Sequence, residues 1–145
     1  MKKLIIAAIT ILSLSSCETS KIVVNRQVES KNDGQMLLGT QTKDQFLKEP
    51  FSEWYSKEHD EYTLDEAAMA ELKKAKLKSY QITAIMGTWC EDSHREFPRM
   101  MKILEAADFP TEKLTIIAVN RKKESPEGEE GKFNIQRVPT FIIKK

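Results

Sequence analysis

The sequence is poor in residues on which several classes of protein depend. Its 145 residues include 2 cysteines and 2 histidines, and Lys plus Arg total 23 against 22 for Asp plus Glu. Proteins that bind nucleic acid usually carry a basic excess, so this near balance predicts no nucleic-acid partner. With 40% hydrophobic and 31% charged residues and no internal repeat, the chain fits one small domain around a single core.

The first residues form the one long apolar run of the chain. MKKLIIAAITILSLSSC combines two lysines, apolar residues from Leu4 to Leu14 and small residues before a cysteine. This pattern is typical of a secretory leader and is too short for a membrane-spanning helix. Its ending resembles the lipobox of bacterial lipoproteins, which implies a signal peptide over 1–16 and a lipid on Cys17. An ordinary cleaved signal peptide is the alternative.

A lipid on Cys17 implies a membrane anchor and a location in the bacterial cell envelope, with the domain facing the periplasm or the exterior. Cys90 is then the lone thiol of the mature domain, and no internal disulfide is possible. A lone thiol in an oxidising compartment is a liability unless it is buried or used.

Composition divides the rest of the chain into a tether and a domain. We interpret the polar residues 17–35 as a tether, and residues 36–145 as the domain with an N-terminal helical extension over 42–78. Pro50 is expected to interrupt the extension. Thr63 and Glu66 have the spacing of a capping box, which predicts a helix starting at Leu64.

The second half of the chain predicts an α/β arrangement. Residues 80–86 and 114–119 are apolar runs of strand length, and a helical apolar pattern separates them. We expect a right-handed crossover between two inner strands that are covered on both faces. Residues 121–131 form a charged loop, and 138–143 form a further strand.

The stretch MGTWCEDSHREFP predicts a strand that runs through a turn into a helix. Cys90 then lies at the helix N-terminus, where free N–H groups and the positive end of the dipole stabilise a thiolate. His94 and Arg95 add to this effect if they are well placed, whereas Glu91 and Asp92 oppose it. The sequence alone does not decide whether these charges together raise or lower the pKa of Cys90.

Residues 80–145 resemble the thioredoxin family. Trp89-Cys90-Glu91-Asp92-Ser93 stands where that family has W-C-x-x-C, and Pro98 follows the cysteine at the family's distance. The stretch FNIQRVPT, residues 133–140, resembles the segment that leads into the family's cis-proline. The resemblance implies an α/β thioredoxin-like fold, with a central mixed sheet flanked by helices and a cis Val138–Pro139 bond.

The resemblance also implies roles for individual residues. Cys90 takes the place of the nucleophile, Trp89 shapes the surface beside it, and Pro139 packs against the sulfur. Val138 offers its backbone to an extended substrate, with Thr140 next to it. It implies no cofactor, and no metal is expected, because Cys90 and His94 lack a clear third ligand.

Ser93 departs from the family at the position of the resolving cysteine. A serine hydroxyl cannot release a mixed disulfide, so Cys90 needs an external thiol to turn over. The partners expected are protein or small-molecule thiols and disulfides, used in a monothiol cycle, in partner capture or in a sensor role. The alternatives are an inert Cys90 on a thioredoxin-like peptide-binding module, with Ser93 a simple polar residue of the first helical turn.

The chain stops at Lys145, directly after the strand that follows Pro139. Thioredoxin-like domains normally continue with a strand and a helix, so we expect a domain lacking both elements and an exposed edge over 141–143. A truncated gene remnant and a domain completed by a partner are both compatible with this ending.

Overall fold

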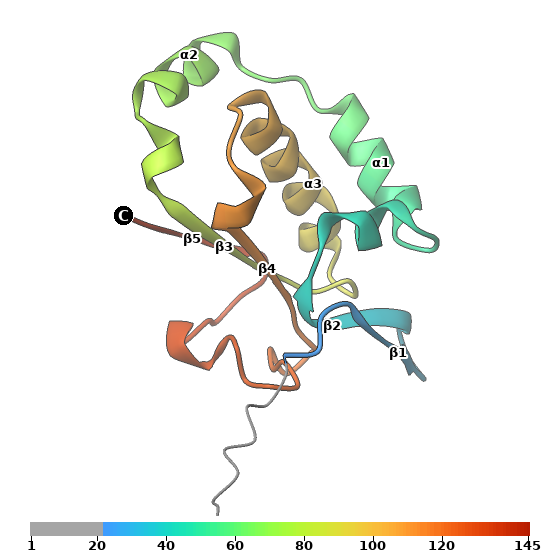
Figure 1. Ribbon diagram of the computed structural model, residues 1–145. Helices are drawn as coiled ribbons and strands as arrows, with labels where there is room; N and C mark the ends of the chain where they lie inside the picture. Colours follow the sequence, from blue (N-terminus) through green and yellow to red (C-terminus); the bar gives the residue numbers. More distant parts are fainter. Residues whose placement is uncertain (1–21) are drawn as a thin grey trace, which may run out of the picture.

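The computed structural model describes residues 22–145, so the predicted leader and Cys17 lie outside the described residues. The described chain forms five strands and three α-helices (Figure 1). In chain order these are β1 (Arg26–Ser30), β2 (Gly34–Gln41), α1 (Ser52–Glu61), α2 (Glu66–Lys74), β3 (Gln81–Met86), α3 (Glu91–Ala106), β4 (Leu114–Ala118) and β5 (Thr140–Lys144). Short 3-10 turns join several of them, including Lys43–Leu47 before Pro50.

The strands form one mixed sheet in the order β1-β2-β4-β3-β5. β3 and β4 are parallel, with Ala84 opposite Ile116, and every other neighbouring pair is antiparallel. Helix α3 provides the crossover between the two parallel strands, as predicted. The α/β class and the mixed sheet are therefore confirmed, and β5 lies at an edge of the sheet as expected.

All three α-helices cover the same face of the sheet (Figure 1). Successive strand residues point to opposite faces. Ala84 and Met86 of β3 pack with Tyr55 of α1 and Phe97 of α3 in the main core cluster. Ile82 lies in a second cluster on this face, to which α2 contributes Met69.

The opposite face of the sheet is covered by the segment between β4 and β5. Ile85 and Ile117 pack there with Val138 and Phe133 from this segment. Farther from it, Gln81 and Thr115 are exposed and Thr83 is half-buried. The expectation that both faces of β3 and β4 are covered is therefore wrong for the first halves of the strands, which carry polar side chains on this face.

Part of the predicted tether is folded. Arg26–Ser30 forms β1 and pairs with β2 through a tight hairpin, with Val28 opposite Met36. β1 is an edge strand with one face toward solvent, so it carries polar side chains that resemble a linker in composition. The interpretation of residues 17–35 as a tether is wrong for 26–35.

Helix α2 begins two residues later than predicted, at Glu66 instead of Leu64. The Asp65 carboxylate accepts a hydrogen bond from the Ala68 N–H at 2.8 Å, and the helix begins at Glu66. Asp65 is as good a cap as Thr63. The predicted helical extension over 42–78 does contain α1 and α2, with Pro50 lying between the 3-10 turn and α1.

Candidate functional site

Cys90 is the N-terminal cap residue of α3, directly after the turn that ends β3. Its N–H donates to the Gly87 carbonyl at 3.0 Å, and its own carbonyl accepts the His94 N–H at 2.9 Å. The side chain is half-buried, and Sγ lies 3.5 Å from the Val138 carbonyl oxygen. The sulfur is thus held at the mouth of a helix and remains accessible.

The segment Val138–Pro139 reaches Cys90 because β5 pairs with β3. Thr140, the first residue of β5, lies opposite Ile85 in the register. Val138 is buried, and the Val138–Pro139 peptide bond is cis, as expected. The sheet therefore brings Cys90, Val138, Pro139 and Thr140 into one region.

Two of these residues are engaged differently from expectation. The Val138 carbonyl accepts the Cys90 thiol, so part of the backbone predicted to pair with a substrate is already in contact with the sulfur. The Thr140 hydroxyl donates to the Arg137 carbonyl at 2.7 Å. This bond fixes the turn into β5, and the Thr140 hydroxyl is used within the chain.

Ser93 is fully buried one turn into α3. Its hydroxyl oxygen accepts the Gly87 N–H at 3.2 Å. A buried backbone N–H needs such a partner. Ser93 therefore stabilises the turn between β3 and α3, and it provides no sulfur beside Cys90.

The Trp89 ring packs against the turn that precedes the cysteine. Its Nε1–H donates to the Val119 carbonyl at 2.8 Å. A Cβ added at Gly87 would lie 2.7 Å from the indole ring, closer than side chains allow. Glycine at position 87 is thus required by the approach of the ring, and Trp89 forms the surface next to Cys90.

His94 supports the same turn from the helix side. Its Nε2 lies 2.7 Å from the Thr88 carbonyl, which can only accept, so Nε2 carries the hydrogen. The ring stacks on Trp54 of α1 with a centroid distance of 4.3 Å and an angle of 13°. His94 therefore positions the backbone before Cys90.

Arg95 binds acidic side chains of its own helix, and not the Cys90 thiol. Its guanidinium binds Glu96 at 2.6 Å and Asp92 at 2.9 Å, both on α3. The hydrogen bonds that Arg95 donates to Glu96, and then to Asp92, raise the pKa of Arg95. The charge of Arg95 is thus used within its own helix.

Arg121 and Asp33 belong to the site and were missed by the sequence reasoning. The Arg121 guanidinium lies over the Trp89 ring, 5.0 Å from its centroid, and its Nη2 binds an Asp33 carboxylate oxygen at 2.6 Å. The hydrogen bonds from Arg121 hold the pKa of Asp33 below its usual value. No local signal marks either residue, because Asp33 lies in the presumed tether and Arg121 in a charged loop.

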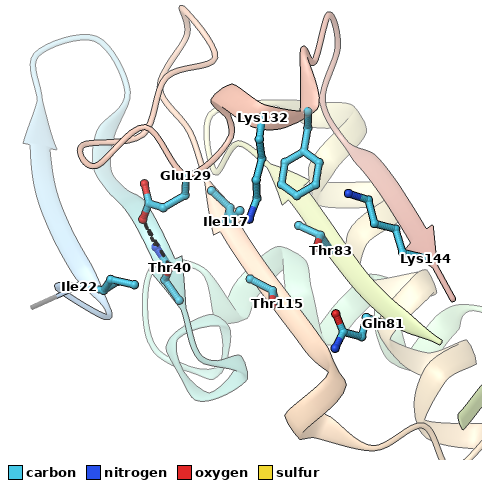
Figure 2. Close-up of a pocket in the computed structure, with 10 residues that line it drawn as sticks. Ile22, Thr40, Gln81, Thr83, Thr115, Ile117, Glu129, Lys132 and Lys144 are labelled. Atoms are coloured by element: carbon cyan, nitrogen blue, oxygen red, sulfur yellow. Dashed lines mark hydrogen bonds between the residues drawn. The ribbon is translucent and has the colours of Figure 1, made fainter. Parts of the chain in front are cut away.

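A cavity of about 280 Å³ opens on the sheet face opposite the α-helices (Figure 2). Polar strand residues such as Thr83 and Thr115 line it, with Glu129 at one side and Lys132 and Lys144 at the other (Figure 2). Neither Cys90 nor Trp89 lines this cavity. The thiol is therefore not part of the wall of this cavity.

Within residues 22–145, no cluster of three or more histidine, cysteine or acidic side chains has the geometry to hold a metal ion. No helix in this part of the chain is long and apolar enough to cross a membrane. Comparison with known proteins returns no match to a protein-family model, to a curated protein or to a solved structure.

Proposed function

We propose that the chain is a thioredoxin-like protein that performs monothiol thiol-disulfide exchange through Cys90. In this proposal a lipid on Cys17 anchors the protein in the bacterial cell envelope, and the domain faces the periplasm or the exterior. Its partners are protein or small-molecule thiols and disulfides, and it needs no metal or cofactor.

The single observation that carries the proposal is the position of Cys90. The half-buried sulfur lies at the start of α3 and 3.5 Å from the Val138 carbonyl. The thiolate is the form of cysteine that attacks disulfides, and the accessible sulfur allows a partner disulfide to approach it. A strand-turn-helix unit that buries Ser93 and leaves the neighbouring sulfur accessible supports chemistry at that sulfur.

The exchange step balances without a further reagent. Cys90 loses its proton to solvent, and the thiolate attacks one sulfur of a partner disulfide. The disulfide bond of the partner breaks, a mixed disulfide forms on Cys90, and the other half leaves as a thiolate. Because Ser93 has no thiol, an external thiol must attack the mixed disulfide to regenerate Cys90.

Turnover measurements on a matched pair of variants test the proposal. We expect the purified protein, with Cys17 replaced by serine in every variant so that Cys90 is its one thiol, to form one adduct with 2-hydroxyethyl disulfide and to keep it until glutathione is added. Ser93→Cys places a thiol next to the sulfur, so its adduct is expected to resolve without external thiol into an internal disulfide. Intact-mass spectrometry of quenched samples follows both reactions.

Cys90→Ser is the control, and it is expected to form no adduct because it lacks the reacting sulfur. If the folded wild-type protein forms no adduct and reacts only after denaturation, the exchange activity is excluded. That result would favour the alternative of a non-catalytic peptide-binding module.

A further inference from the structure

A guanidinium group of defined orientation lies beside the nucleophile. Arg121 follows β4 in a tight turn, where the Asn120 side-chain oxygen accepts the N–H groups of Lys122 and Glu124 at 2.9 and 3.1 Å. Side-chain oxygens that bond the backbone a few residues ahead stabilise such turns. The backbone that carries Arg121 is therefore fixed close to the end of the sheet.

The Arg121 guanidinium contacts Asp33 along one edge and the Trp89 ring on one face. Nε lies 3.0 and 3.1 Å from the two Asp33 oxygens, and Nη2 lies 2.6 Å from one of them. The Asp33 side chain is only 8% exposed, whereas that of Arg121 is 60% exposed. The guanidinium carbon lies over the Trp89 ring, at a distance typical of a cation–π contact.

The contacts leave hydrogen-bond donors of Arg121 unused. A guanidinium has five N–H donors in a planar fork. Nη1 makes no hydrogen bond or ion pair with any residue from 22 to 145. Because Asp33 occupies the Nε edge, the positive edge at Nη1 is free to bind a carboxylate, for which the fork geometry is well suited.

Arg121 lies within electrostatic reach of the reacting sulfur. The Asp33 hydrogen bonds are the main cause that raises the pKa of Arg121, and a negative charge on Cys90 raises it further. Trp89, over which the guanidinium lies, is the residue directly before Cys90. The guanidinium therefore lies beside the surface that a partner disulfide must approach to reach Cys90.

We propose that Arg121 forms an anion subsite beside Cys90, so that Cys90 exchanges preferentially with disulfides that carry a carboxylate close to the sulfur. This inference rests on the proposed exchange at Cys90. The carboxylate binds the free edge of Arg121 while the Cys90 thiolate attacks the neighbouring sulfur. Bonds and electrons follow the exchange step already given, and Arg121 changes only the choice of partner.

The other charged groups near the helix start act against anionic partners. Glu91 and Asp92 are exposed in the first turn of α3, and Arg95 is bound to Asp92 and Glu96. Two cations remain near the sulfur: Arg121, which lies over Trp89, and exposed Arg137, which directly precedes Val138. Of the two, Arg121 is the one whose orientation is fixed, by its hydrogen bonds to Asp33.

A series of three alkyl disulfides that differ mainly in end-group charge tests the subsite. The probes are 3,3′-dithiodipropionate, 2-hydroxyethyl disulfide and cystamine, which are anionic, neutral and cationic. Adduct formation on the full chain is quenched with acid and measured by intact mass at low salt. We expect the anionic-to-neutral rate ratio to fall about two- to fivefold in Arg121→Gln, as for an exposed charge pair, and the cationic-to-neutral ratio to rise.

Arg95→Gln is the matched control, because it removes the same charge from α3 without touching Trp89 or Asp33. We expect both ratios in this variant to equal those of the wild type, and the wild-type ratio to shrink at high salt. Equal ratios in Arg121→Gln and wild type would overturn the subsite while leaving the exchange at Cys90 intact. Absence of any adduct on the folded wild-type protein would overturn both proposals.

Discussion

At the scale of single residues, the site depends on contacts that a few side chains make with one turn. Ser93 accepts the Gly87 N–H, His94 donates to the Thr88 carbonyl, and the Thr88 hydroxyl accepts the Leu37 N–H at 3.3 Å. These contacts come from α3 and β2. They fix the backbone on which the Cys90 sulfur is presented.

Gly87→Ala tests how tightly Trp89 is packed against this turn. The new Cβ would lie 2.7 Å from the indole ring, which is also bonded to Val119 and lies under the Arg121 guanidinium. Because the ring must shift, we expect the free energy of unfolding to fall by about 1–3 kcal/mol. Urea denaturation followed by tryptophan fluorescence measures the change.

Gly131→Ala is the control for this substitution. Its added Cβ has no atom within 4 Å, and its backbone is not in the left-handed region. Stability is expected to stay the same or to rise slightly. Equal losses in the two variants would show that packing on Trp89 is not what requires glycine at position 87.

At the scale of elements, one ionic cluster joins the N-terminal helical extension to α3. Glu105 of α3 binds Lys43 of the first 3-10 turn and His59 of α1, the latter at 2.9 Å. Burial alone would raise the pKa of Glu105, but the hydrogen bonds from Lys43 and His59 outweigh it and lower the pKa. The cluster therefore stabilises the docking of α1 on α3.

The lowered pKa of Glu105 predicts how stability depends on pH. A carboxyl group with a depressed pKa stabilises the fold above its ordinary value of 4.5, and this contribution is lost as the pH falls through the lower folded value. Glu105→Gln is expected to cost about 0.5–1 kcal/mol at pH 7, because the group is partly exposed. The cost should shrink toward pH 3. Thermal unfolding at both pH values measures it.

Glu112→Gln provides the comparison, since Glu112 is exposed and forms no ion pair among residues 22–145. Its effect is expected to stay within about 0.5 kcal/mol at either pH. A Glu105→Gln cost that is as large at pH 3 as at pH 7 would contradict the claim that the ionised Glu105 carboxylate stabilises the fold.

The sequence predicted the elements around Cys90 better than the contacts between distant elements. The apolar runs and the pattern of α3 were sufficient to predict β3, α3, β4 and their crossover. The hairpin was missed because an edge strand carries polar side chains that resemble a linker. Asp33 and Arg121, which are 88 positions apart, meet only through the fold, so no local pattern identifies their contact.

At the scale of the whole molecule, the sheet has two different faces. The α-helices cover one face, whereas the segment between β4 and β5 covers the other only in part and leaves the cavity beside Thr83 and Thr115 (Figures 1 and 2). Cys90 follows β3 at the end of the parallel pair. In open α/β sheets, ligands commonly bind beyond the carboxyl ends of the strands.

The proposed anchor is also a property of the whole molecule. Cys17→Ala removes the thiol that a lipid would modify, so the protein is expected to leave the membrane pellet or to accumulate with its leader attached. Cell fractionation with radiolabelled palmitate measures both effects. Wild-type protein without label, or a variant that stays labelled in the pellet, would contradict lipidation at Cys17.

The rate at which iodoacetamide alkylates Cys90 tests the central claim most directly. The claim is that the fold leaves this sulfur accessible, so that its thiolate, the reactive form of cysteine, can attack a partner. At pH 6, we predict that Cys90 of the native protein reacts within about tenfold of the rate of Cys90 in the protein unfolded in urea. A native rate about tenfold or more below the unfolded rate would contradict the account, because it would mean that the fold protects the sulfur.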